Sequence, residues 1–252
     1  IVNQSFYYLS IFKLPILNSI FSRFILVLLP TYIFIFHSCS PLKKYDLKDR
    51  LWAIPEIDAF EKLNSITKYP EDAILFIGSS SIRLWKTIEE DMAPYSVIQR
   101  GYGGAHFRDL VFFTDRILAN HSLSMVVCFV ANDISGTPRD GSPKEVLKLF
   151  KLFVKQVRDK HPDIPILQIA VTPTLSRWKY WNKIKEVNEL INSFCKKTDG
   201  LYFIDTVPTY LDDKGQPKPE WFIKDQLHLN TKGYEVWNRL IKTEIEKVNK
   251  LN

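Results

Sequence analysis

Cysteine is scarce in this chain, which contains three in 252 residues. Cys39 follows an apolar N-terminal run, whereas Cys128 lies in a strand pattern and Cys195 on the apolar face of a helix pattern. Two cysteines without a tight spacing do not form a disulfide framework. We therefore exclude a disulfide-stabilised scaffold and expect Cys128 and Cys195 to be buried thiols.

The chain also lacks a basic block. Its formal net charge is +6 at pH 7, but the Lys and Arg residues are spread along the sequence and are not interleaved with aromatic residues. A protein that binds nucleic acid usually gathers such residues on one face. We therefore expect no nucleic-acid partner.

Metal-ligand spacings are missing as well. Outside the C-terminal motif described below, no histidine has a neighbour at the spacing typical of a metal site; these residues are His37, His106, His121 and His161. We expect neither a metal nor an organic cofactor. Internal repeats and low-complexity linkers are also absent from the sequence, which favours one folded domain.

The N-terminus reads as a targeting segment. Residues 1–38 contain Lys13 and Arg23 but no acidic residue, and an apolar run covers 24–36. This run has the length of a signal-peptide core and is too short to predict a membrane span. The following Phe36-His37-Ser38-Cys39 resembles a bacterial lipobox, which implies cleavage before Cys39 and a lipid on it. An uncleaved anchor and an ordinary signal peptide are the alternatives.

The rest of the chain alternates strands and helices. We expect residues 39–70 to form a tether with a short helix and residues 71–252 to form the main domain. Strand patterns cover 73–77, 96–99, 125–130, 165–171 and 201–204, and helix patterns cover 108–118, 143–157, 184–194 and 231–248. Such alternation predicts a single doubly wound, flavodoxin-like α/β domain with a parallel sheet of roughly five strands and helices on both faces.

Four loops carry residues that fit one reaction, and each loop lies at the carboxyl end of a predicted strand or beyond the last strand. These residues are Ser80, the pair Gly103-Gly104, Asn132, and Asp225 with His228. Ligands bind at the carboxyl ends of the strands in such sheets, and residues three apart share one face of a helical turn. Together the four loops supply the nucleophile, base, carboxylate and oxyanion donors of acyl transfer. Singly, each has a plain structural alternative as a cap, turn or surface residue.

These four blocks, in this order, resemble those of the SGNH or GDSL hydrolases, and the resemblance runs from Ala73 to the C-terminus. Gly78-Ser79-Ser80 matches the nucleophile block, 101–104 the glycine block, Asn132-Asp133 the asparagine block and 225–228 the Asp-x-x-His block. The chain is most similar to a bacterial lipoprotein subgroup that reads Gly-Ser-Ser-Ser-Ile-Arg-x-Trp. The resemblance implies the fold predicted above and hydrolysis of esters.

The resemblance also implies a role for each residue of a triad. Ser80 attacks the ester carbonyl, His228 takes its proton and later passes it to the leaving alcohol, and Asp225 orients the imidazole. The spacing of the serine run alone leaves Ser79 and Ser81 open as nucleophiles.

The implied oxyanion hole consists of the N–H groups of Ser80 and Gly104 and the side-chain amide of Asn132. Aromatic and arginine side chains near these loops are candidates for the substrate pocket, because they suit sugars or polar acyl groups. They are Trp85, Tyr102, His106, Arg177, Trp178 and Trp181. Core packing or helix docking is the alternative, and for Trp85 it is the preferred one. For His106 the alternative is a surface role.

We therefore expect an exported serine esterase, lipid-anchored in the bacterial cell envelope at its periplasmic or outer-membrane face. Its substrate would be a small molecule or glycan that carries a small acyl ester, such as acetyl, on a carbohydrate or similar polar alcohol. A lipase, lysophospholipase or thioesterase acting on longer chains is one alternative. A surface lipoprotein that binds a glycan without turnover is another. The sequence leaves the oligomeric state open.

Overall fold

The computed structural model describes residues 47–118 and 121–251. The predicted signal peptide and the lipid attachment at Cys39 lie outside these residues. Within them, no helix is both long and apolar enough to cross a membrane.

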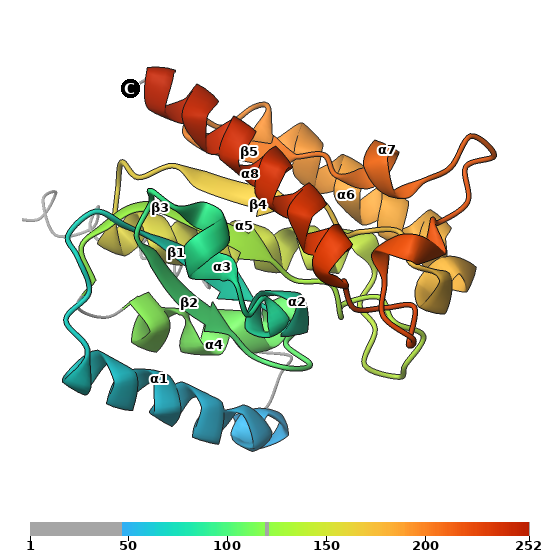
Figure 1. The fold of residues 1–252 in the computed structure, drawn as a ribbon. Coiled ribbons are helices and arrows are strands. Elements are labelled where there is room, and N and C mark those ends of the chain that lie inside the picture. The colour runs from blue at the N-terminus through green and yellow to red at the C-terminus, as the bar shows by residue number, and fades with distance from the viewer. Residues whose placement is uncertain (1–46, 119–120, 252) are drawn as a thin grey trace, which may run out of the picture. The chain divides into compact units, whose positions relative to one another are not determined.

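A five-stranded parallel sheet forms the centre of the described domain (Figure 1). Its strands are β1 (Ala73–Gly78), β2 (Val97–Gly101), β3 (Leu123–Phe129), β4 (Ile166–Ile169) and β5 (Leu201–Ile204). Their order is β2-β1-β3-β4-β5, and every neighbouring pair is parallel. The predicted flavodoxin-like α/β sheet is confirmed. All six residues of β1 are buried, since strands flank β1 on both sides and helices cover both faces.

Alternate residues of each strand point to opposite faces of the sheet, and two apolar cores result. Residues such as Leu75 and Ile77 pack into the core shared with α1 (Ile54–Ile66), α4 (Phe107–Leu118), α5 (Pro143–Lys160) and α6 (Trp181–Cys195). Residues such as Ile74 and Phe76 pack into the core shared with α2 (Ser80–Leu84), α3 (Ile88–Met92), α7 (Val207–Tyr210) and α8 (Thr231–Leu251). The 3₁₀ segments are η2 (Leu47–Ala53), η3 (Leu175–Tyr180) and η4 (Pro219–Trp221).

Local signals fix some of these boundaries. At the start of α5, Ser142 accepts from the backbone N–H of Glu145, and the Glu145 side chain accepts from the Ser142 N–H, which is the capping box that the sequence predicts. By contrast, β4 ends at Ile169, before the predicted end at Val171. The Val171 N–H and C=O bond the side-chain amide of Asn188 on α6 and so leave the strand ladder.

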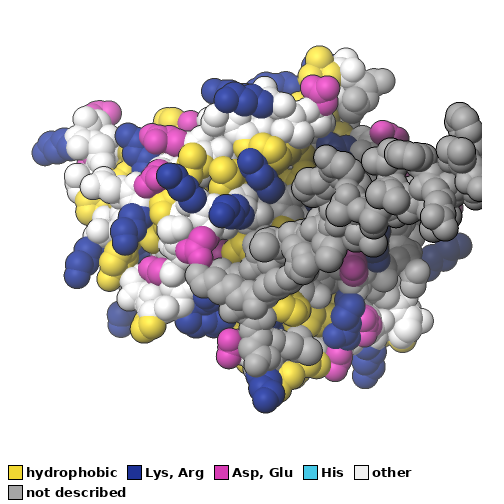
Figure 2. All heavy atoms as spheres, turned by 180° about the vertical axis from the view of Figure 1, so that it is seen from behind, with side chains coloured by type: hydrophobic (Ala, Val, Ile, Leu, Met, Phe, Trp, Pro, Cys, Tyr) yellow, Lys and Arg dark blue, Asp and Glu magenta, His cyan; other side chains and the backbone are white. Residues whose placement is uncertain are grey.

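Both described cysteines are free and buried, as expected. Burial raises the pKa of the Cys195 thiol to about 12, which leaves it protonated and unreactive at neutral pH. Among the coloured side chains in Figure 2, Lys and Arg are interspersed with Asp and Glu.

Candidate active site

A close approach of two backbones places Ser80 at the end of β1. A Cβ on Gly78 would lie 1.9 Å from the Phe129 carbonyl oxygen on β3, so only glycine fits where the chain turns into α2. The Ser79 N–H donates to the same carbonyl (2.9 Å). Ser79 and Ser81 are buried, whereas Ser80 is half-buried and opens toward the loop that precedes α8.

That loop brings a histidine and a carboxylate to the serine. The Nε2 of His228 lies 2.9 Å from Ser80 Oγ, and its Nδ1 lies 2.7 Å from Asp225 Oδ2. The other Asp225 oxygen accepts from the N–H groups of Leu227 and His228. The segment is therefore an Asx-type turn and not the helical turn that the sequence suggested. Its Gln226 has a φ of 54°.

The protonation state of this loop follows from its contacts. Burial alone would raise the pKa of the Asp225 carboxyl, but the hydrogen bonds from His228 and from backbone N–H groups hold this pKa below its usual value. An ionised carboxylate only accepts hydrogen bonds, so Nδ1 of His228 carries the proton that faces it. When the imidazole is neutral, Nε2 is then an acceptor, and Ser80 Oγ–H is the donor that it meets.

Two further loops carry the predicted oxyanion donors. Gly104 lies in the turn after β2 with a φ of 73°, a conformation that glycine adopts at little cost. Asn132 follows β3, and its Nδ2 donates to the carbonyl of Ala105 (2.9 Å). This bond joins the Asn132 loop to the Gly104 loop at the carboxyl ends of the strands, where Ser80 also lies.

A small cavity opens beside Ser80. Its volume is about 20 Å³, which is room for one or two water molecules. Polar side chains and apolar side chains share its wall. The lining consists of Ser79, Ser80, Ser81, Phe129, Ala131, Asn132, Val171, Thr172, Thr174, Arg177, Leu227, His228, Leu229 and Trp237.

Of the predicted pocket residues, Arg177 lies at this cavity. It is half-buried on η3, and its Nη1 and Nη2 donate to the Ala131 carbonyl (2.5 Å) and to Asn132 Oδ1 (2.6 Å). The sequence predicts Arg177 to be a substrate contact near the site, whereas its observed partners are protein groups.

Trp85 and Tyr102 are core residues, and their assignment to the pocket is wrong. Both are fully buried. Trp85 donates to Asp91 (2.6 Å) and stacks on Tyr234 of α8 with ring centroids 5.3 Å apart. Tyr102 packs into the opposite core.

The remaining predicted pocket residues also lie away from the cavity. Trp178 and Trp181 stack on each other (centroids 5.7 Å apart), and Trp181 borders a separate surface hollow on α6. His106 is buried, with Nδ1 3.0 Å from the Gly104 carbonyl and 3.1 Å from Asp109. It contacts the glycine loop from behind and does not line the cavity.

The sequence analysis did not assign several cavity residues to the site. Thr172 and Thr174 follow β4, and their position after a strand was the signal that could have identified them. Trp237 lies in the last helix pattern, 231–248, and nothing local in the sequence indicates that it reaches the cavity. Among the described residues, no group of three or more His, Cys, Asp or Glu side chains could hold a metal ion.

Comparisons with known proteins place this geometry in a family. A sequence model of the GDSL-like Lipase/Acylhydrolase family matches residues 65–236, which is more than half of the chain. No curated protein matches the chain.

Solved structures share the fold at low sequence identity. A Streptococcus pneumonia protein described as a platelet activating factor is 22% identical, with a TM-score of 0.67 over 81% of this chain and 95% of that one. A GDSL-like lipase from Bacteroides thetaiotaomicron is 18% identical, with a TM-score of 0.65 over 76% and 98%. An acetylxylan esterase from Geobacillus stearothermophilus is 14% identical, with a TM-score of 0.57 over 71% and 96%.

Proposed function

The chain belongs to the GDSL-like lipase/acylhydrolase family of ester-hydrolysing serine hydrolases, and we propose that Ser80, His228 and Asp225 are its catalytic triad. The observation that carries this proposal is the pair of hydrogen bonds at His228, one to Ser80 Oγ and one to Asp225. In this arrangement the serine proton has an acceptor, and the imidazolium that forms has a carboxylate beside it.

The proposed reaction proceeds through an acyl-enzyme. Ser80 Oγ forms a bond to the ester carbonyl carbon while His228 Nε2 takes its proton, and the collapse of the tetrahedral intermediate releases the alcohol with that proton. Water then attacks the acyl-enzyme in the same way, with His228 again as base. The carboxylic acid leaves and Ser80 regains its proton.

We propose that the N–H groups of Ser80 and Gly104 and the Asn132 amide stabilise the oxyanion. Asn132 lines the cavity beside Ser80, and a neutral amide donates to a negative oxygen without the repulsion that a carboxylate would cause. Removal of one such donor typically lowers kcat by about 10²–10³-fold. We expect a loss of this size in Asn132→Ala.

The proposed substrate is a small acyl ester, such as an acetyl ester, of a carbohydrate or similar polar alcohol. The small size of the cavity beside Ser80, about 20 Å³, favours a short acyl group over a long chain. The acetylxylan esterase with the same fold acts on a substrate of this class. The polar alcohol is inferred from that likeness and from the expected cell-surface location.

Hydrolysis of p-nitrophenyl esters from acetyl to palmitoyl tests the proposal. We expect kcat/KM to be highest for acetyl, and turnover to vanish in Ser80→Ala and to persist in Ser79→Ala and Ser81→Ala. A maximum at long chains would replace the small-acyl substrate with a lipid. Absence of turnover in a folded wild-type protein would favour glycan binding without catalysis.

We also propose that the protein is exported and anchored by a lipid on Cys39. The support is the lipobox-like sequence after the apolar run. These residues lie outside the described structure, so the support comes from the sequence alone. Expression in a bacterium fed labelled palmitate should label the wild type and leave Cys39→Ser unlabelled. An equal label in both would disprove attachment at Cys39.

A further inference from the structure

Arg177 makes both of its described side-chain hydrogen bonds with one loop, the segment Ala131-Asn132 after β3. The backbone that carries Arg177 is fixed as well, because its N–H donates to the Thr174 hydroxyl (3.3 Å) and carbonyl (3.2 Å) at the start of η3. The contact is rigid because the backbone of Arg177 is hydrogen-bonded and its guanidinium donates two hydrogen bonds to the same loop.

The partners of Asn132 determine which way its amide faces. Its Oδ1 accepts from the guanidinium of Arg177 at 2.6 Å, and its Nδ2 donates to the Ala105 carbonyl at 2.9 Å. In the reversed orientation the NH₂ group would face the donors of Arg177, and the amide oxygen would face another carbonyl oxygen. The contacts therefore select one orientation and use one of the two Nδ2 protons. The second proton stays available to a group in the cavity that Asn132 lines.

The charge of Arg177 adds a second effect. Asp140 and Asp133 act on this guanidinium from a distance. Within the described residues no carboxylate oxygen lies within ion-pair distance of it, and its direct contacts are the Asn132 amide and the Ala131 carbonyl. A cation at the oxygen end of an amide withdraws electrons from it and strengthens its N–H as a donor. The half-buried setting reduces the screening of this charge by water.

We propose that Arg177 is a positioning residue for the oxyanion donor: it fixes the Asn132 amide with one N–H toward Ser80 and strengthens that donor. This inference rests on the proposed function, because it assigns Asn132 to the oxyanion. It differs from the substrate contact expected from the sequence, since Arg177 would act through Asn132 and would not bind the alcohol or the acyl group.

A double-mutant cycle separates these roles. The variants are Arg177→Met, Asn132→Ala and the double mutant, assayed with p-nitrophenyl acetate. Because the whole effect of Arg177 runs through Asn132, we expect Arg177→Met to lower kcat by about tenfold or more with little change in KM. In the Asn132→Ala background the same change should alter kcat by less than about twofold. Arg177→Lys, which keeps the charge without the planar fork, should recover part of kcat.

Arg158→Met is the matched control. Arg158 is also half-buried, and its guanidinium also donates to two backbone carbonyls, those of Pro162 and Asp199, but at a distant part of the domain. We expect its kcat to equal that of the wild type. If the effects of Arg177→Met and Asn132→Ala multiplied in the double mutant, or if Arg177→Met raised KM alone, Arg177 would be a substrate contact and the proposal would be wrong.

A measurement without turnover keeps this proposal separate from the proposed function. In the wild type, the side-chain NH₂ signals of Asn132, assigned by their loss in Asn132→Ala, should exchange slowly with solvent. They should exchange at least about tenfold faster in Arg177→Met, because the amide is then free to rotate. Unchanged exchange would overturn the positioning role. A wild type without Ser80-dependent hydrolysis would instead overturn the triad and leave the exchange result standing.

Discussion

The molecule contains two aspartate–histidine pairs with the same spacing and different surroundings. His106 and Asp109 lie three residues apart at the start of α4, and Asp225 and His228 lie three apart in the loop before α8. In each pair the imidazole Nδ1 faces a carboxylate oxygen, at 3.1 Å in the first and 2.7 Å in the second. The difference begins at the other ring nitrogen. Nε2 of His228 meets Ser80, whereas Nε2 of His106 is buried without a hydrogen-bond partner in the described structure.

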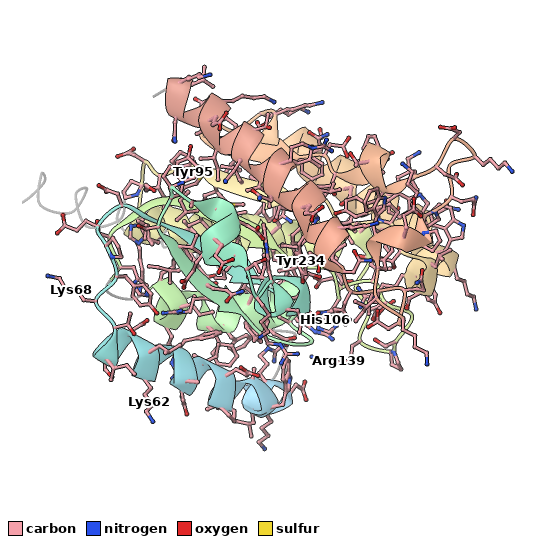
Figure 3. All side chains as sticks on the ribbon, in the orientation of Figure 1. Lys62, Lys68, Tyr95, His106, Arg139 and Tyr234 are labelled. Atoms are coloured by element: carbon pink, nitrogen blue, oxygen red, sulfur yellow. The ribbon has the colours of Figure 1, made fainter. Side chains whose placement is uncertain are left out.

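The charges around the two carboxylates differ as well. Asp109 is fully buried and has Arg50 Nε at 3.6 Å and Arg139 Nη2 at 3.2 Å; Figure 3 shows Arg139 beside His106. Burial alone would raise the pKa of Asp109, but the hydrogen bond and charge of His106 and the charge of Arg139 hold it below its usual value. Asp225 is 43% exposed, and His228 is the basic side chain within ion-pair distance of it in the described structure.

This comparison shows what makes such a pair suitable for catalysis. A carboxylate that already faces two arginines is neutralised whether or not its histidine is protonated, so that pair mainly stabilises the fold. A carboxylate that faces only a histidine stabilises the imidazolium as it forms. The pair also needs a nucleophile at the second nitrogen and access to a cavity, and only the loop before α8 provides both.

The largest expected difference follows from removal of each imidazole. His228→Ala should lower kcat by about 10³-fold or more, because Ser80 loses its base, with little change in the melting temperature. His106→Ala should keep kcat within about tenfold and lower the melting temperature by several degrees, since Asp109 loses a partner worth about 1–3 kcal/mol. Activity assays and thermal unfolding measure both. Equal losses of kcat in two folded variants would show that the buried pair takes part in the reaction.

The carboxylates sharpen the same contrast. Asp225→Asn should lower kcat by about 10²–10⁴-fold, because the amide no longer holds the imidazole tautomer or its charge. Its free energy of unfolding should stay near that of the wild type. Asp109→Asn should instead lower that free energy by about 3–5 kcal/mol, since it removes the carboxylate that the buried Arg50 guanidinium faces.

Urea unfolding and initial rates at one pH measure the two quantities for both variants. A stable Asp109→Asn protein would mean that the arginines near it are neutralised by other groups. In that case the buried pair would not have the structural role given to it here.

The sequence identified the residues of one pair and not the role of the other, for physical reasons. Ser80, Asn132 and the Asp225–His228 loop stand at strand ends or in a short motif, where position in the chain determines position in space. His106 also stands after a strand and was assigned to the pocket wall. Its inward direction depends on Asp109 and on the arginines around it, one of which, Arg139, lies 30 residues farther along the chain.

The same limit explains the other misplaced residues. A parallel sheet could be expected from the alternating pattern, and the carboxyl ends of its strands bring the loops that follow them to one edge. The direction of a side chain after a strand is decided by packing. Trp85 turns inward because Tyr234 and Trp237 of α8 offer it ring contacts, and these residues are about 150 positions away along the printed sequence. The partner of Arg177 is an amide 45 residues before it, which no local pattern could indicate.

The smallest expected effect concerns Asp133, a third carboxylate that is buried near the His106–Asp109 pair. It accepts from the Phe107 N–H and has no cation in ion-pair contact in the described structure. Burial raises its pKa to about 6, opposite in direction to the shift at Asp109. A proton on Asp133 therefore binds the folded state more tightly than the unfolded state, in which an aspartate has a pKa of about 3.9. The contribution of this group to the free energy of unfolding is fully present below about pH 3.9 and is lost as the pH rises through about 6.

Asp133→Asn isolates this contribution, because the amide oxygen still accepts from Phe107 and the group no longer titrates. Between pH 4.5 and 7.5, the variant should gain about 2 kcal/mol of unfolding free energy relative to the wild type. Any loss from the extra NH₂ group is the same at both pH values and cancels. Urea unfolding of both proteins at the two pH values gives the difference. A difference of zero would mean that Asp133 is ionised as readily as Asp109, and that contact with arginine is not what separates the two buried carboxylates.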